Sequence, residues 1–85
     1  EKLNTEQLIT LFEQAKLNFQ QYHPTWRYGQ SIFNTGMVLH PELFEQIRGT
    51  EADPFYQNSR VPAMVEHLFD LAAVTYYYRT LHIKI

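Results

Sequence analysis

The sequence predicts an all-α fold: a compact bundle of about four helices, formed by a single domain over residues 1–85. Apolar residues recur at spacings of three and four along most of the chain, as on one face of a helix. Pro, Gly and Asn stand where such segments begin or end, and runs that alternate as strands do are scarce. With 45% hydrophobic and only 19% charged residues, the chain is too apolar for a disordered segment.

The first predicted helix covers about 4–21. Asn4 is a suitable N-cap, and Gln7 follows three residues later, as in a capping box. The helix is expected to end before His23, because Pro24 disfavours helical backbone in the residue that precedes it. Its apolar face is formed by Leu8, Phe12, Ala15, Phe19 and Tyr22.

Two shorter helices are predicted in the middle of the chain. The second helix covers 26–38 and is capped by Thr25. Gly36 either ends this helix or lets another helix approach closely, and we favour a helix that continues past it. The third helix covers 41–48 and ends at Gly49, which suits left-handed backbone.

The loop after the third helix contains an Asp-Pro-Phe turn. Asp53 is expected to be structural, because its side chain can accept hydrogen bonds from the backbone of the turn that Pro54 begins. A pairing of Asp53 with Arg48 or Arg60 remains open. Phe55 is expected to anchor the loop to the core.

The last predicted helix covers 61–80, and its second half is apolar nearly all round. A small domain has difficulty covering such a helix alone, so an apolar stripe at helical spacing predicts an interface. This stripe consists of Leu68, Phe69, Ala72, Ala73 and Tyr76. A homodimer through the last helix would cover it. Tyr76, Tyr77 and Tyr78 point in three directions, so at least one must leave the core. The alternating residues 81–85 are read as an extended tail or simply the end of the chain.

The predicted core follows from the faces of these helices. It contains Phe12, Phe19, Trp26, Phe33, Met37, Leu43, Ile47, Phe55, Val65, Leu68 and Leu71.

Charged residues are nearly missing from one long stretch. Between Leu17 and Pro41 the only formally charged side chain is that of Arg27, whereas about a quarter of the residues in a typical domain are charged. Either the second helix is central and mostly buried, or it presents a neutral, hydrogen-bonding face to a partner, and both can hold together.

Several spaced motifs of the chain resemble a family of small uncharacterised proteins from bacteria and phages. They follow the order W-R-x-G-Q-x-x-F-N, then P-x-L, then I-R-G-T-x-x-D-P-F, and fall within about residues 22–68. The motifs are Trp26-Arg27-Tyr28-Gly29-Gln30, Phe33-Asn34, Pro41-Glu42-Leu43, Ile47-Arg48-Gly49-Thr50 and Asp53-Pro54-Phe55-Tyr56. The resemblance implies a compact α fold and an ancestry in mobile elements, with no known activity.

Catalytic and metal chemistry find little support in the residues. The chain has no Cys, and its four histidines (His23, His40, His67 and His82) lie in different elements without metal-ligand spacing. His67 has Asp70 three residues on, but a solvated helix face explains that pair. The serines lie in no nucleophile turn and the glycines form no phosphate loop. We therefore expect no enzyme, no cofactor and no metal.

Nucleic-acid binding is the alternative reading. Arg27, Arg48 and Arg60 have the aromatic residues Trp26, Tyr28 and Tyr56 near them in sequence, and these rings can stack on bases. A net charge of −2 gives no general attraction to phosphates, however. A basic patch made by the three arginines would favour nucleic acid, whereas pairing of all three within the fold would favour a protein partner.

The favoured reading is a small non-catalytic protein-interaction module that binds a host protein or a second copy of itself. Its expected partner-binding residues are Arg27, Gln30, Asn34, Phe69, Ala73, Tyr76 and Tyr77. We expect a cytoplasmic protein, since the longest apolar run is too short to cross a membrane.

Overall fold

The computed structural model describes residues 2–83, with side chains up to Leu81, and within this range the fold is all-α. The helices are α1 (Thr5–Leu17), α2 (Tyr28–Leu39), α3 (Pro41–Ile47), α4 (Val61–Leu68) and α5 (Leu71–Ile83). A π-helical turn, η1 (Asn18–Tyr22), extends α1, and a 3-10 turn, η2 (Asn58–Arg60), leads into α4. The predicted tail falls partly in α5, and its last two residues lie outside the described range.

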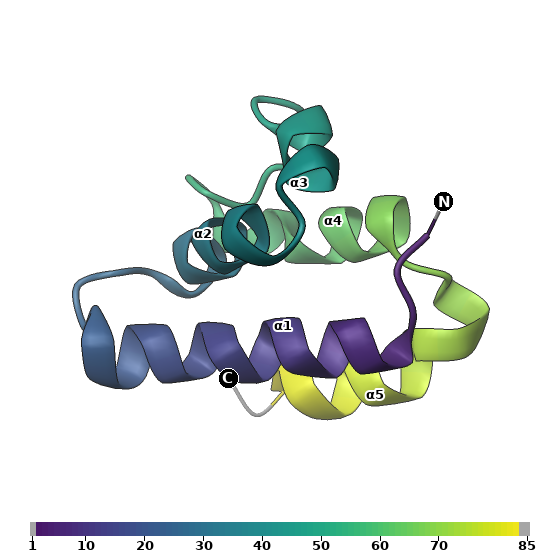
Figure 1. The fold of residues 1–85 in the computed structure, drawn as a ribbon, viewed down its shortest axis with the longest axis horizontal. Helices are drawn as coiled ribbons and strands as arrows, with labels where there is room; N and C mark the ends of the chain where they lie inside the picture. Colours follow the sequence, from purple (N-terminus) through teal and green to yellow (C-terminus); the bar gives the residue numbers. More distant parts are fainter. Residues whose placement is uncertain (1, 84–85) are drawn as a thin grey trace.

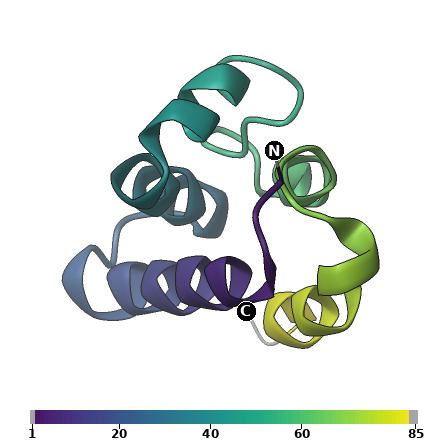
Figure 2. The ribbon, with the colours of Figure 1, turned by 45° about the vertical axis from the view of Figure 1, so that its right-hand side comes forward.

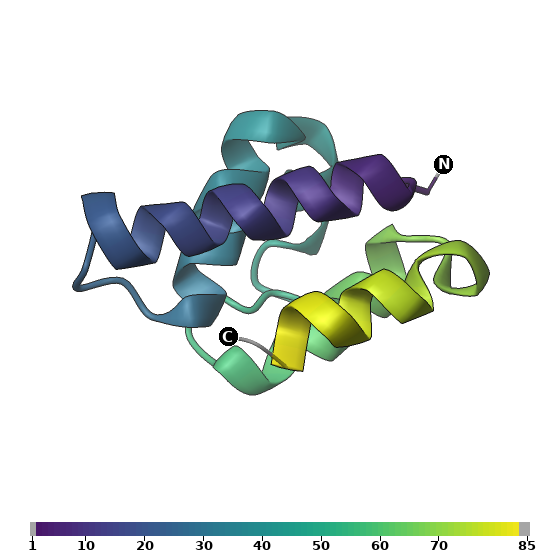
Figure 3. The same cartoon turned by 90° about the horizontal axis from the view of Figure 1, so that it is seen from below.

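The helices surround one core (Figure 1). Helix α1 packs along α2 on one side and along α5 on the other, and Figure 3 shows α1 and α5 side by side. Helix α3 lies on α2, and α4 completes the ring opposite α1 (Figure 2). The N-terminal segment runs from the start of α1 to the end of α4, so it closes the gap between these two helices.

The start of α1 has the predicted capping box. The Gln7 backbone N–H donates to Asn4 Oδ1 at 2.9 Å, and the Asn4 N–H donates to Gln7 Oε1 at 2.8 Å. These two bonds satisfy N–H groups that a helix start otherwise leaves open. The first helix is therefore confirmed, but its last five residues widen into η1, which turns Tyr22 out to 64% exposure.

Uncharged polar side chains join α2 to α1. The buried Ser31 hydroxyl donates to the Ala15 carbonyl at 2.6 Å, and Asn18 Nδ2 donates to Thr35 Oγ1 at 2.9 Å. These bonds satisfy polar groups that would be costly to bury alone. The charge-poor second helix is thus central along this face.

The close approach at Gly36 is also present. A Cβ atom at Gly36 would lie 2.3 Å from the ring of Phe44 on α3, so only glycine lets α2 and α3 pack here. The predicted start of this helix was too early. The Trp26 N–H donates to the His23 carbonyl in a turn, and α2 begins at Tyr28 with Arg27 as its N-cap residue.

The single last helix predicted over 61–80 is wrong, because the chain breaks at Phe69 and Asp70. Phe69 is extended (φ −119°, ψ 157°) and forms an isolated parallel bridge with Leu3. The Leu3 N–H donates to the Leu68 carbonyl at 2.8 Å. Asp70 then starts α5, with its Oδ1 accepting from the Ala72 N–H at 3.2 Å. The break places Leu68 and Phe69 in the core, although both were expected on an outer stripe.

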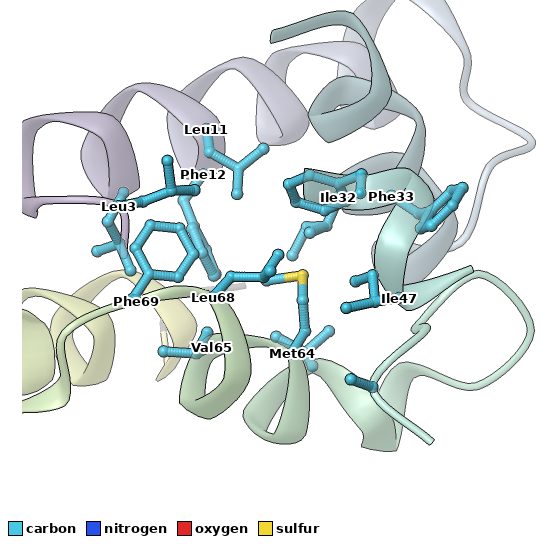
Figure 4. Packing of buried hydrophobic residues seen from close by; sticks show 14 of the residues in the cluster. Leu3, Leu11, Phe12, Ile32, Phe33, Ile47, Met64, Val65, Leu68 and Phe69 are labelled. Carbon is cyan, nitrogen blue, oxygen red and sulfur yellow. The ribbon is translucent and has the colours of Figure 1, made fainter. Parts of the chain in front are cut away.

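The core confirms part of the prediction (Figure 4). Of the predicted residues, Phe12, Phe33, Ile47, Val65 and Leu68 are buried, and Met37, Leu43 and Phe55 pack at the edge. Phe19 and Trp26 are only half-buried and Leu71 is 39% exposed, so these three were wrong. The widened turn displaces Phe19, and the break in the last helix displaces Leu71. The prediction missed the buried side chains of Leu8, Leu11, Ile32, Phe44, Met64, Phe69 and Val74.

Candidate functional site: an uncharged groove between α1 and α2

A groove lies between the end of α1 with its π turn and the outer face of α2. It encloses about 340 Å³ and is lined by Gln14, Asn18, His23, Trp26, Asn34, Thr35, Val38 and Leu39. No Asp, Glu, Lys or Arg is among these residues. The charge-poor stretch of the sequence therefore forms one wall and the floor of a single surface hollow.

One end of the groove is apolar. Val38 is 79% exposed and Leu39 is 38% exposed, although both belong to the helix that the core packs against. Trp26 stacks on His23, with ring centroids 3.8 Å apart and planes only 8° from parallel. The lining of the groove therefore includes an aromatic stack.

Both walls present side-chain amides: Gln14 and Asn18 from α1 and its π turn, and Asn34 from α2. Asn18 is held by its bond to Thr35, as described above. Gln14 and Asn34 make no side-chain hydrogen bond with the part of the chain that the structure describes. Their amides therefore offer donors and acceptors to a ligand in the groove.

The backbone beside the groove has an unusual form. The π-helical turn Asn18–Tyr22 begins at the lining residue Asn18, and such turns are frequent at functional sites. The groove is thus marked by its composition, by its exposed apolar side chains and by its backbone.

The three arginines surround a different feature, the loop between α3 and η2. Arg27 donates to the Phe55 carbonyl, and Arg60 donates to the Thr50 carbonyl at 3.2 Å. Arg48 pairs with Glu45 at 3.1 Å and lies over the ring of Phe33. Each arginine therefore makes a contact within the fold, but among the described residues only Arg48 pairs with a carboxylate. The choice between a protein partner and nucleic acid stays a prediction.

Asp53 is the centre of the same loop. Its carboxylate is buried and accepts from the Gly49 N–H at 2.7 Å and from the Phe55 N–H at 2.9 Å. Gly49 adopts the left-handed backbone (φ 77°) that was expected there. Asp53 therefore has the structural role predicted for it, although the arginine partners left open for it bond elsewhere.

The expected partner-binding residues do not form one site. Asn34 lines the groove, whereas Gln30 accepts from the Arg27 N–H at 3.2 Å and so caps α2. Phe69 is only 1% exposed, so its expected place in a docking stripe was wrong. Sequence periodicity assigned it to the outer face because it assumed an unbroken helix.

The outer face of α5 keeps some exposed rings. Tyr76 is 73% exposed and Tyr77 is 43% exposed, while Tyr78 packs edge-on against Phe12 with ring centroids 5.8 Å apart. Ala73 is exposed beside them. At least one tyrosine of the run therefore leaves the core, as predicted.

The groove residues Trp26, Val38 and Leu39 were not among the expected binding residues. Trp26 was assigned to the core, and Val38 was read as the last residue of its helix. The sequence signal that pointed toward the groove was the scarcity of charged residues between Leu17 and Pro41.

Two further kinds of feature were sought among the described residues. Among the side chains of residues 2–81, no three His, Asp or Glu lie close enough to hold a metal ion. None of the helices described is long and apolar enough to span a membrane. No known protein family, curated protein or solved structure matches the chain.

Proposed function

We propose that the protein is a small non-catalytic interaction module that binds another protein through the uncharged groove between α1 and α2. The observation that carries this proposal is the exposure of Val38, 79%, at the apolar end of a hollow without formal charge. Exposed aliphatic and aromatic groups beside neutral polar ones are typical of the core of a protein interface.

The expected energy of such contacts is sufficient for recognition. Full burial of one aliphatic side chain contributes about 1.5–3 kcal/mol. Val38, Leu39 and Trp26 together offer several such contacts, and the Trp26 ring already stacks on that of His23.

A second contact through α5 is a separate part of the proposal. The apolar surface available to the homodimer expected from the sequence is smaller than predicted, because Leu68 and Phe69 are buried within the chain. The surface left for it consists of Ala72, Ala73, Tyr76 and Tyr77. Sedimentation at micromolar concentration, with Tyr76→Glu as the variant, tests it.

Affinity capture from the source cell tests the main proposal. Val38→Glu places a charge in the groove at an exposed position, so the fold is retained while binding is lost. Thr80→Glu is the matched control, because it places the same charge on an exposed β-branched residue of α5 that lies outside both proposed surfaces. We expect a protein that the wild type and Thr80→Glu retain after nuclease treatment and that Val38→Glu does not. Loss of the retained material on nuclease treatment would instead favour nucleic acid.

A further inference from the structure

The chemistry of the groove limits what can bind in it, and this inference rests on the proposed function. Three other surface hollows each contain at least one carboxylate. One is lined by Glu42 and Glu45, another by Lys2 and Glu42, and a third by Glu6. In the groove between α1 and α2, by contrast, no lining residue has a formal charge at neutral pH.

A charged ligand group would therefore lose its hydration in the groove without gaining an ion pair. Removing a charge from water is costly unless a partner compensates it. A neutral group does not carry this penalty. The groove consequently discriminates against charged side chains by the absence of counter-charges.

The amides of the groove suit peptide groups. Gln14 and Asn18 come from one wall, and Asn34 comes from the other. Each has both donors and an acceptor, as a backbone peptide group has. A segment that lies between these walls can bond its own N–H and C=O groups to them while a side chain reaches the apolar end.

The size of the groove sets the length of this segment. Its volume of about 340 Å³ is near the lower limit of ligand pockets, which is about 300 Å³. A helix that docks in a groove uses several anchors over two turns, and this hollow is too small for them. One large side chain with its adjacent peptide groups fits.

We infer that the groove binds an uncharged segment of a partner polypeptide, with one large apolar side chain placed against Trp26, Val38 and Leu39 and its neighbouring peptide groups bonded by Gln14, Asn18 and Asn34. The occupant is thus an internal or terminal stretch without Lys, Arg, Asp or Glu at the anchor.

Blocked amino acids test this inference by NMR titration of the isotope-labelled protein. The probes are the N-acetyl methylamides of Leu, Trp, Asp and Lys, which share the same two peptide groups and differ in the side chain. We expect the Leu and Trp probes to shift the signals of Asn18, Asn34 and the Trp26 indole. The Asp and Lys probes should bind at least tenfold more weakly. An alcohol with the same branched end, 3-methylbutanol, lacks peptide groups and should bind more weakly than the Leu probe.

Two variants complete the test. Val38→Glu should abolish the shifts caused by the Leu probe, and Thr80→Glu, at an exposed position of α5, should leave them unchanged. The inferred chemistry is wrong if the Asp or Lys probe binds as tightly as the Leu probe. It is also wrong if no probe shifts the NMR signals of the groove residues while capture still depends on Val38. In either case the proposed function stands. If capture of the partner is independent of Val38, the proposed function is wrong and the inference fails with it.

Discussion

Two irregular segments flank α2, and they use their polar groups in opposite ways. The polar groups of the loop over 49–57 bond within the fold: Asp53 accepts two backbone N–H groups, and Arg27 and Arg60, from outside the loop, donate to loop carbonyls. The segment over 18–27 contributes Asn18 and the stack of Trp26 on His23 to the lining of a surface groove. Charged content near a segment therefore does not by itself mark a binding surface in this chain, because the arginines around the loop bond within the fold.

The same contrast divides α2 itself. Ser31 and Thr35 bond to α1, whereas Asn34 and Val38, three residues further along in each case, face the groove. One helix thus serves as the centre of the fold on one face and as the floor of the candidate site on another. The reading of α2 as a central helix is confirmed on the inward face, and the reading of its outer face as a partner surface stays a prediction.

The largest expected loss of stability follows from removal of the Phe33 ring, which holds the loop over 49–57 against the core. Phe33 is 3% exposed and contacts the rings of Phe44 and Phe55, with centroids 5.9 Å apart in each case. Phe33→Ala should lower the free energy of unfolding by about 3–5 kcal/mol, measured by chemical denaturation. Phe55→Ala should cost less, because Phe55 is only half-buried. Equal losses would mean that the loop contributes more to the core than its burial indicates.

Removing the carboxylate at the centre of the loop should have the next largest effect. Asp53→Ala leaves two backbone N–H groups without their acceptor and should cost about 1–3 kcal/mol. Glu51→Ala, two residues away and exposed, should change stability by less than about 0.5 kcal/mol. Thermal unfolding of both variants measures the difference. A similar melting temperature for the two would contradict the structural role of Asp53.

Substitutions on the two faces of α2 should differ in their effect on stability, and this difference should be smaller than that expected at Asp53. Ser31→Ala removes a buried bond of 2.6 Å to Ala15 and should cost about 0.5–1.5 kcal/mol. Asn34→Ala removes a side chain that faces the groove and should leave stability nearly unchanged. Chemical denaturation of both variants would show whether the polar groups of α2 divide as described.

The smallest expected effect is a dependence on pH at His40, which directly follows the groove residue Leu39. Burial lowers the pKa of His40. As the pH falls through about 6.5, the unfolded chain takes up this proton before the folded chain does, so stability falls until His40 is protonated in the fold as well. Stability at pH 7.5 should exceed that at pH 5.5 by less in His40→Gln than in the wild type. His67→Gln, at an exposed position, is the control. If the difference in stability between the two pH values changes equally in both variants, His40 is not its cause.

The helical class and most of the helix boundaries follow from the sequence because caps and breakers act locally. Asn4 with Gln7, Pro41 and Gly49 each decide a boundary through neighbouring backbone. The break at Phe69 was missed because it depends on Leu3, which is far away in the sequence and pairs with it only in the folded chain. A local signal was nevertheless present, since Asp70 is a good N-cap and now begins α5.

The candidate site was only partly predictable. The missing charges pointed to the right stretch and to Asn34, but not to the partner wall that α1 supplies. Gln14 and Asn18 belong to the polar side of an amphipathic helix, where such residues are ordinarily solvated. Their place in a groove depends on the packing of α2 against α1.

The central claim is that binding and stability reside in different segments on either side of α2. The most direct test measures both quantities for Val38→Glu and Asp53→Ala under one set of conditions, at a temperature where both variants are folded. We predict that Val38→Glu keeps the wild-type free energy of unfolding and loses the captured protein, while Asp53→Ala loses stability and keeps the captured protein. Retained binding in Val38→Glu, together with binding lost in fully folded Asp53→Ala, would contradict the claim and assign the binding surface to the arginine-lined loop.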